Sequence, residues 1–273
     1  MVELTIKINP VKIKTEMKLS KAIVIKGNYK KLNESQIEKI RMYILNKPNL
    51  TLDDVLSMRS SYMNMKIFEN NNKLLKNIKK LKKFYLKGIS IKELSKVHDF
   101  SPISMLKNIF YKLGVSKNKV KDYFNKVGNI SEFDLEQINF ALNNDIFNKV
   151  DQSEQIENSE NFEEKVKNFL LSKNISFKTQ DELREEQIIK YGKPINTPDF
   201  LILSNLVING KKINWIDAKN FYGANTFLIR KKIKKQVQKY IDDYGYGCIL
   251  FSLNFSEKLN FDNVLLLSSM SLI

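Results

Sequence analysis

The sequence predicts an α/β domain in its C-terminal half, preceded by an all-α region. Two changes along the chain lead to this prediction. From about residue 33 to 147 apolar residues recur at helical spacing, whereas beyond residue 160 apolar runs typical of buried strands alternate with helical segments. Charge divides the chain at the same place, because residues 1–150 hold 29 Lys and Arg against 14 Asp and Glu, and residues 151–273 hold 17 against 16. We therefore expect two domains, 1–150 and 151–273.

The N-terminal half is expected to be helical after a different beginning. Residues 1–30 alternate apolar and charged positions, which suggests a hairpin or a loosely attached, β-rich arm. Residues 90–114 predict two helices joined by a short turn, because Ser101 followed by Pro102 is a strong helix start. This spacing is typical of a helix-turn-helix, and a helical pair that only packs is the alternative. The residues that would face a nucleic-acid groove are Ser101, Ser104, Lys107 and Asn108.

The basic first half favours a polyanionic partner, with nucleic acid preferred over an anionic membrane surface. An AT-biased genome would explain a high lysine content, and so part of the formal charge of +16, but it explains the segregation of that charge less well. No apolar run is long enough to span a bilayer, and the N-terminus does not resemble a signal peptide. The single cysteine, Cys248, allows no intrachain disulfide, which fits an intracellular protein, cytoplasmic or nuclear. His98 is the only histidine, so we expect it to be structural.

The second half is expected to contain a helix, three strands, a helix and two strands. Asn209-Gly210 is a strong signal for a hairpin turn between the second and third strands. The expected elements are residues 162–173, 175–178, 200–208, 213–218, 225–243, 247–253 and 264–267.

Charged residues lie at the ends of the two apolar runs that flank this turn. Asp199 precedes the first run, and Asp217 and Lys219 close the second. Residues two apart on a strand point to the same face, so Asp217 and Lys219 project together. Two carboxylates, with the carbonyl of Ala218, can hold Mg²⁺ or Mn²⁺ through oxygen ligands, and Lys219 could orient or help deprotonate an attacking water, or neutralise developing charge. The plainer alternative is a turn residue and a solvated strand end.

The position of Asp199 depends on the register of the hairpin. A strict two-residue turn pairs Ile208 with Lys211 and turns Asp199 to the face opposite Asp217 and Lys219. A metal site therefore requires a three-residue connection or a bulge.

Flanking helices contribute further candidates. Glu163, on the preceding helix, could reach the metal directly or through water. Gln236 and Tyr240 are four residues apart, so they share one face of the following helix. The same helix carries a basic run that could follow a phosphate backbone or could simply be a solvated face. This run contains Arg230, Lys231, Lys232, Lys234, Lys235 and Lys239.

These motifs resemble the PD-(D/E)xK nuclease superfamily, and more closely its TPD-motif family. The resemblance covers about residues 160–255, and it departs from the family in a longer loop at 181–196 and a heavier basic run at 230–235. It is carried by Thr197-Pro198-Asp199-Phe200, Trp215-Ile216-Asp217-Ala218-Lys219, Phe221 to Gly223, and Gln236 with Tyr240.

The resemblance implies a restriction-endonuclease-like αβββαβ core, with a mixed sheet flanked by helices. It also implies a metal-dependent hydrolase, with catalytic residues Asp199, Asp217, Lys219, Gln236 and Tyr240. The implied metal ligands are Glu163, Asp199, Asp217 and Ala218.

Taken with the charge pattern, these features predict a Mg²⁺- or Mn²⁺-dependent endo- or exodeoxyribonuclease whose basic N-terminal region binds DNA. The alternatives are a non-catalytic nucleic-acid-binding adaptor or regulator on an inactive nuclease fold, and an RNA-directed nuclease. No residue identifies a protein partner, and a homodimer is left open.

Overall fold

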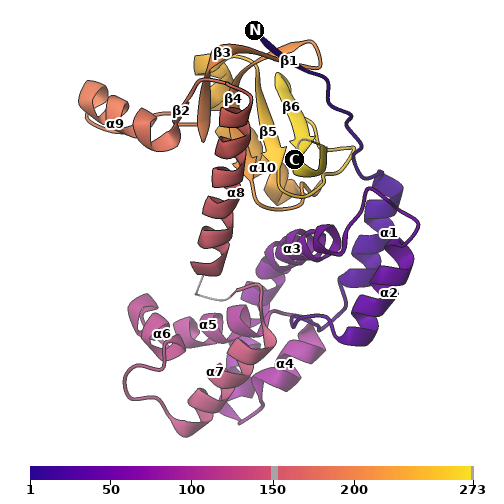
Figure 1. Cartoon of the computed structure of the whole chain (residues 1–273). Helices are drawn as coiled ribbons and strands as arrows, with labels where there is room; N and C mark the ends of the chain where they lie inside the picture. Colours follow the sequence, from indigo (N-terminus) through magenta and orange to yellow (C-terminus); the bar gives the residue numbers. More distant parts are fainter. Residues whose placement is uncertain (149–152, 272–273) are drawn as a thin grey trace. The chain divides into compact units, whose positions relative to one another are not determined.

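The computed structural model describes residues 1–148 and 153–271 (Figure 1). Close contacts divide the chain into two compact units. Unit 1 contains Met1–Leu19, Ile40–Ser61 and the chain from Ser153 onward, and unit 2 contains Ser20–Lys39 and the described residues from Tyr62 to Asn148. The boundary predicted at residue 150 lies outside the described residues.

The chain also passes from one unit to the other within three helices. These are α1 (Ile13–Ile23), α2 (Glu34–Ile44) and α3 (Leu52–Leu86). A passage inside a continuous helix leaves no linker composition in the sequence, so a search for Pro-, Gly- or Ser-rich boundaries cannot find it.

Unit 1 is built on a mixed six-stranded sheet with the order β1-β3-β4-β5-β6, in which β2 pairs with β3 off this path. Strands β3 and β4 form an antiparallel hairpin, whereas β4, β5 and β6 run parallel. At opposite ends of β3, β1 joins in parallel and β2 antiparallel. The strands are β1 (Val2–Leu4), β2 (Phe177–Thr179), β3 (Phe200–Ile208), β4 (Lys211–Lys219), β5 (Gly247–Phe251) and β6 (Val264–Ser268).

Helices cover both faces of this sheet, as the predicted α/β class requires. Helix α8 (Ser153–Ser172) buries Val166 in the same cluster as Leu250, whereas α10 (Phe227–Tyr244) buries Val237 in the same cluster as Ile249. Ile249 and Leu250 are neighbours on β5, whose side chains alternate between the faces. Figure 1 shows α8 in front of the sheet and α10 behind it.

The first residues of the chain differ from the predicted hairpin or arm. They form β1, which extends the sheet, and then α1. The side chain of Asn209 in the hairpin turn accepts a hydrogen bond from Ile6 N (2.8 Å) and donates one to Ile6 O (2.9 Å). Unit 1 is therefore assembled from both ends of the chain.

The predicted loop at 181–196 contains a helix, α9 (Gln180–Tyr191). It begins with a capping box between Thr179 and Glu182 and ends at Gly192, whose φ of 74° suits glycine. Leu183 is the only buried residue of α9 in the described structure. A helix with a single buried apolar residue does not show the regular apolar spacing by which a helix is found in a sequence.

Unit 2 is helical. The second part of α3 packs with α4 (Ile91–His98), α5 (Pro102–Lys112), α6 (Lys117–Phe124) and α7 (Glu132–Asn144). A three-residue turn joins α4 to α5, and Ser101 caps α5 with Pro102 in its first turn, as predicted. The shared core buries Leu81, Ile91, Ile103, Leu106 and Phe110.

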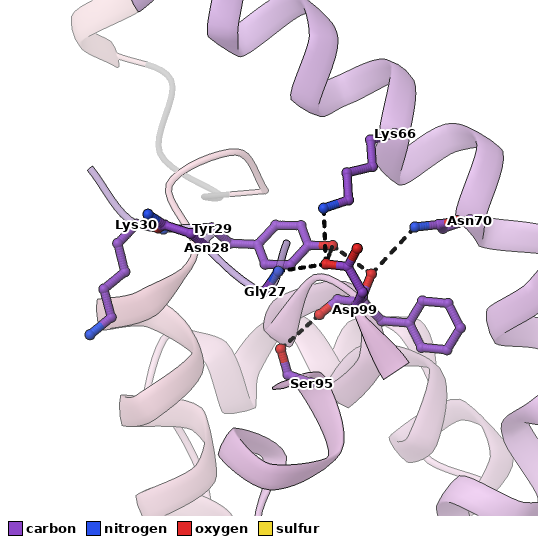
Figure 2. Close-up of polar contacts among 9 residues, drawn as sticks. Gly27, Asn28, Tyr29, Lys30, Lys66, Asn70, Ser95 and Asp99 are labelled. Carbon is purple, nitrogen blue, oxygen red and sulfur yellow. Dashed lines mark hydrogen bonds and ion pairs between the residues drawn. The ribbon is translucent and has the colours of Figure 1, made fainter. Parts of the chain in front are cut away.

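Asp99 holds the turn between α4 and α5 in place. It adopts a left-handed conformation with a φ of 54°. Its carboxylate accepts hydrogen bonds from Gly27 N (2.7 Å) and Lys66 Nζ (2.9 Å). Its carbonyl accepts from Tyr29 OH (2.7 Å) and Asn70 Nδ2 (3.3 Å). Figure 2 shows Lys66 and Asn70 reaching this turn from α3, so one residue links three segments of unit 2.

Candidate functional site

The turn of the β3–β4 hairpin has two residues. Asn209 and Gly210 both have positive φ, 50° and 73°, and Ile208 pairs with Lys211. This geometry matches the strand twist, as expected for an Asn-Gly turn. If the pairing continued regularly, Asp199 would point away from the face of Asp217.

A bulge in β3 reverses this outcome. Leu206 pairs with Ile213, and the next pair joins Leu201 to Trp215. Between these two pairs the chain advances five residues along β3 but only two along β4. The three extra residues are an odd number, and β3 therefore resumes pairing on the other face. Continuing the new register by one residue places Asp199 opposite Asp217. The structure thus contains the bulge that the metal-site hypothesis required.

The two acids are buried and held by hydrogen bonds. Asp199 is 9% exposed and Asp217 is 0% exposed. Asp199 Oδ2 accepts from Ala218 N (2.7 Å), and Asp217 Oδ1 accepts from Gln236 Nε2 (3.0 Å). Burial, followed by the charge of Asp217, raises the pKa of Asp199 to about 8. Burial also raises the pKa of Asp217, against the opposing charge of Lys219. Two ionised carboxylates buried side by side destabilise the fold unless cations neutralise them. Such perturbed acid pairs are typical of functional sites.

Lys219 supplies one such cation. Its ammonium forms an ion pair with Asp217 Oδ2, and its side chain is 14% exposed. Burial alone would lower the pKa of Lys219, but the charges of Asp217 and Asp199 outweigh that effect and raise it. A lysine that remains cationic can neutralise charge or orient a water, but it cannot accept a proton. The ion pair with Asp217 and the raised pKa of Lys219 therefore favour these roles over that of a general base.

Gln236 and Tyr240 connect α10 to the acids. Gln236 Nε2 also donates to Tyr240 OH (2.9 Å), which in turn donates to Thr197 O (3.3 Å). The Tyr240 ring packs 5.2 Å from the Trp215 ring, and burial raises the pKa of Tyr240. Tyr240 is only 5% exposed, so it has little surface with which to contact a substrate. Its hydroxyl instead holds the side chain of Gln236 and the carbonyl of Thr197 in place.

Glu163 lies half-buried on α8. Burial raises the pKa of Glu163, the charge of Lys219 lowers it, and the charge of Asp217 raises it again. The charges of Lys219 and Asp217 therefore act on Glu163, and its role as a metal ligand stays a prediction.

The residue types fit a hard divalent cation. Asp199, Asp217, Glu163 and the Ala218 carbonyl all offer oxygen donors, which Mg²⁺ and Mn²⁺ prefer. In the described part of the chain, however, no three His, Cys, Asp or Glu side chains are close enough together to form a complete site. Because Lys219 lies against Asp217 Oδ2, a cation at that oxygen would compete with it.

Lys232 is a further candidate residue that the sequence did not distinguish within its basic run. It lies four residues before Gln236, which lies four before Tyr240, so the three share one face of α10. Lys232 is exposed. Burial raises the pKa of Asp217, whereas the positive charges of Lys219 and Lys232 act to lower it. The spacing from Gln236 is the signal that could have identified it.

The other basic residues of α10 that were predicted to contact nucleic acid, Arg230, Lys231, Lys234 and Lys235, are exposed. Arg230 Nη1 donates to Asn225 Oδ1 (2.7 Å), and Lys231 Nζ lies 5.7 Å from the centre of the Phe227 ring. The helical period turns Lys231 and Lys234 away from the face of Gln236. Lys235 lies between these faces.

Ser101 does not face outward, contrary to expectation. It is 3% exposed, and its hydroxyl donates to the Asp145 carboxylate and accepts from Ser104 N (3.1 Å). Its bond to the fully buried Asp145 accounts for its burial. Ser104, Lys107 and Asn108 are partly exposed, and Asn108 Nδ2 donates to Ser104 O (2.8 Å). Burial lowers the pKa of Lys107, and the charge of Asp145 opposes this.

The sequence of this chain is similar to those of a known family and of several other proteins. The model of the family described as "Protein of unknown function TPD sequence-motif" matches residues 131–270. An uncharacterized protein of Acanthamoeba polyphaga mimivirus is 27% identical over 192 residues, which cover 69% of this chain and 68% of that protein.

CDAN1-interacting nuclease 1 of Homo sapiens is 28% identical over 95 residues, and the Mus musculus protein of the same name is 27% identical over 95. Each match covers 35% of this chain and 31% of the nuclease, so the chain spans less than a third of the length of these relatives. No solved structure matches. Across residues 1–148 and 153–271, no helix combines the length and apolar character needed to cross a membrane.

Proposed function

Because this chain belongs to the TPD sequence-motif family, we propose that it is a metal-dependent nuclease that hydrolyses phosphodiester bonds in DNA, on a restriction-endonuclease-like core. The observation that carries the proposal is the β3 bulge, which sets Asp199 opposite Asp217 and beside Lys219. A buried pair of acids with an adjacent lysine is poorly explained as a solvated strand end. Similarity to relatives named as nucleases supports the same reading.

The carboxylates of Asp199 and Asp217, with the Ala218 carbonyl, would hold Mg²⁺ or Mn²⁺, and Glu163 would reach it directly or through water. The ion would polarise the phosphodiester and lower the pKa of a bound water. Lys219 would orient that water or neutralise charge that develops on the phosphate.

Residues of α10 would keep this arrangement in place. Gln236 holds the Oδ1 atom of Asp217 through its amide, and Tyr240 fixes Gln236 in turn. Because Asp217 Oδ1 is bonded to Gln236, its other oxygen is left to pair with Lys219, and a metal ion bound there would have to displace that ammonium. Precise placement of this kind is worth a large part of the rate in phosphoryl-transfer sites.

The excess of positive charge in residues 1–150 supports nucleic acid as the substrate. DNA is proposed over RNA on the resemblance of the nuclease core. Parallel assays with matched DNA and RNA strands distinguish the two substrates.

The test is a cleavage assay with purified protein, Mg²⁺, Mn²⁺ or EDTA, and single-stranded, duplex and branched DNA. Metal-dependent cleavage is expected, and Asp217→Asn and Lys219→Ala should each reduce the rate by about 10²-fold or more. Asp122→Asn, which alters an exposed acid on α6, is the matched control. Undiminished activity in the Asp217 and Lys219 variants would refute the mechanism. Nucleic-acid binding without metal-dependent cleavage would support a non-catalytic adaptor instead.

A further inference from the structure

A row of lysines on α3 takes no part in the proposed nuclease site. Residues 70–92 contain eight lysines and no acidic residue. Four of the lysines recur along α3 at spacings of three, four and three, which places them on one side of the helix. We call this group the lysine stripe, and it consists of Lys73, Lys76, Lys80 and Lys83.

The lysine stripe is exposed and not neutralised. All four side chains are exposed, and none forms an ion pair within the described part of the chain. Like charges three and four residues apart repel one another and destabilise a helix. The row therefore weakens α3 unless an anionic partner offsets the repulsion.

The rest of unit 2 holds this part of α3 in place. Opposite the stripe, Leu74, Leu81 and Tyr85 are buried in the unit 2 core. Tyr85 OH donates to Asp134 Oδ1 (2.5 Å), on α7. One turn before the stripe, Asn70 on α3 is bonded to the fixed turn at Asp99 (Figure 2). The lysines are thus presented on a packed helix, which reduces the entropy lost when a partner binds.

We propose that the lysine stripe of α3 binds the phosphate backbone of nucleic acid independently of base sequence. At 1.5 Å per residue the stripe extends about 15 Å, which equals the axial rise of about four phosphates on one DNA strand, at about 3.4 Å each. The choice of nucleic acid rests on the proposed function, whereas the binding itself does not require cleavage.

An anionic membrane surface fits the same stripe less well. An amphipathic helix that lies in a membrane inserts its apolar face into the lipid. The apolar face of this part of α3 packs into unit 2 through Leu74, Leu81 and Tyr85 and is not available for insertion. This part of α3 also exposes Leu75 and Leu86, but these two lie eleven residues apart and do not form a continuous apolar face.

The experiment measures binding of the full chain to a DNA duplex of about 24 base pairs by fluorescence anisotropy, in EDTA, from about 50 to 200 mM NaCl. The stripe variant is Lys76→Gln with Lys80→Gln and Lys83→Gln. The control is Lys117→Gln with Lys119→Gln and Lys121→Gln on α6, because it removes the same charge from exposed positions that do not form one row. Thermal melting of both variants verifies that each remains folded.

The stripe variant should bind about tenfold more weakly at low salt, and its slope of log K against log salt should be smaller by about 2 to 3 than that of the wild type. The control should change both values much less. Equal losses in the two variants would overturn the proposal in favour of diffuse charge. It would also be overturned if the stripe variant lost binding to phosphatidylserine vesicles and kept its DNA affinity.

These outcomes are separate from those of the nuclease test. If the wild type cleaves DNA and the stripe variant binds DNA as well as the wild type, only the proposal for the lysine stripe is refuted. If the wild type does not cleave DNA but the slope of log K against log salt is smaller in the stripe variant, only the proposed nuclease function is refuted.

Discussion

Asp217 and Lys219 show what single residues contribute to the site. Their spacing of two on a strand guarantees a common face, so their proximity could be predicted from the sequence. Their protonation could not be, because it depends on burial and on Asp199, which approaches from another strand. Buried acids and a paired lysine change one another's pKa through distances that local sequence does not contain.

At the same scale, Lys232 is expected to hold the substrate phosphate beside Asp217. Lys232→Gln should raise KM for DNA about three- to tenfold with a smaller change in kcat, since it removes binding charge and leaves the acids intact. Lys232→Arg should restore most of the loss. Steady-state cleavage kinetics measure both. Lys231→Gln, on the far side of α10, is the control, and an equal rise in KM there would contradict the assignment.

The raised pKa of Asp199 predicts how the folding stability of the metal-free protein, kept in EDTA, depends on pH. Its pKa of about 8 in the folded protein exceeds the usual 3.8 of an aspartate, so the folded state binds the proton more tightly than the unfolded state. The associated stability is present below about pH 4 and is lost as pH rises through about 8. The melting temperature should therefore fall by a few degrees over this window.

Asp199→Asn should flatten this fall, because the amide does not titrate and can still accept from Ala218 N. Differential scanning fluorimetry across the pH range measures the effect. The same slope in Asp199→Asn and wild type would show that another group is responsible. Asp122→Asn should keep the wild-type slope.

At the scale of secondary-structure elements, the hairpin depends on more than its turn. The Asn209-Gly210 turn formed as its sequence predicts, yet the bulge in β3 decides which face Asp199 occupies. The bulge has no marker such as proline or glycine within β3. It is seen only in the pairing of β3 with β4, where the register shifts between Leu206 and Leu201.

The close packing of β4 against β5 gives a prediction for Gly247. A Cβ atom at this position would lie 2.0 Å from the Trp215 ring, which is anchored by a bond from Nε1 to Gly245 O (2.9 Å). Gly247→Ala should therefore lower the free energy of unfolding by about 3 kcal/mol, measured by urea denaturation. In a Trp215→Leu background the same change should cost clearly less. An equal cost in both backgrounds would rule out the clash with the ring.

At the scale of the whole molecule, the mixed sheet with helices on both faces is what the alternation of strand and helix patterns predicts. The two units contain different residues from the two predicted domains. Met1–Leu19 and Ile40–Ser61 belong with the sheet of unit 1 and not with the N-terminal helices. The polar start of α3 contributes to this assembly, since Asp54 Oδ1 accepts from Asn254 N (2.7 Å). Residues 200 positions apart in the chain thus share one unit.

Metal binding should be visible in the stability of the whole chain. If Mg²⁺ binds the folded state alone, a concentration of about 100 times Kd raises the free energy of unfolding by about 2.7 kcal/mol. Melting with increasing MgCl₂ should show this gain in the wild type and in Asp122→Asn. It should be absent from Asp217→Asn, and a gain of equal size there would place the ion elsewhere.

The sequence by itself determined the alternation of strands and helices in the second half, the Asn209-Gly210 turn, the cap of α5 and the common face of Asp217 and Lys219. Each of these depends on contacts within a few residues, where periodicity and capping chemistry act. Only the tertiary structure decided that Asp199 joins Asp217, that Ser101 is buried, that Lys232 lies near the acids, and that the first residues complete the sheet. These features depend on contacts between distant segments and on the burial they produce, and neither is encoded in local spacing.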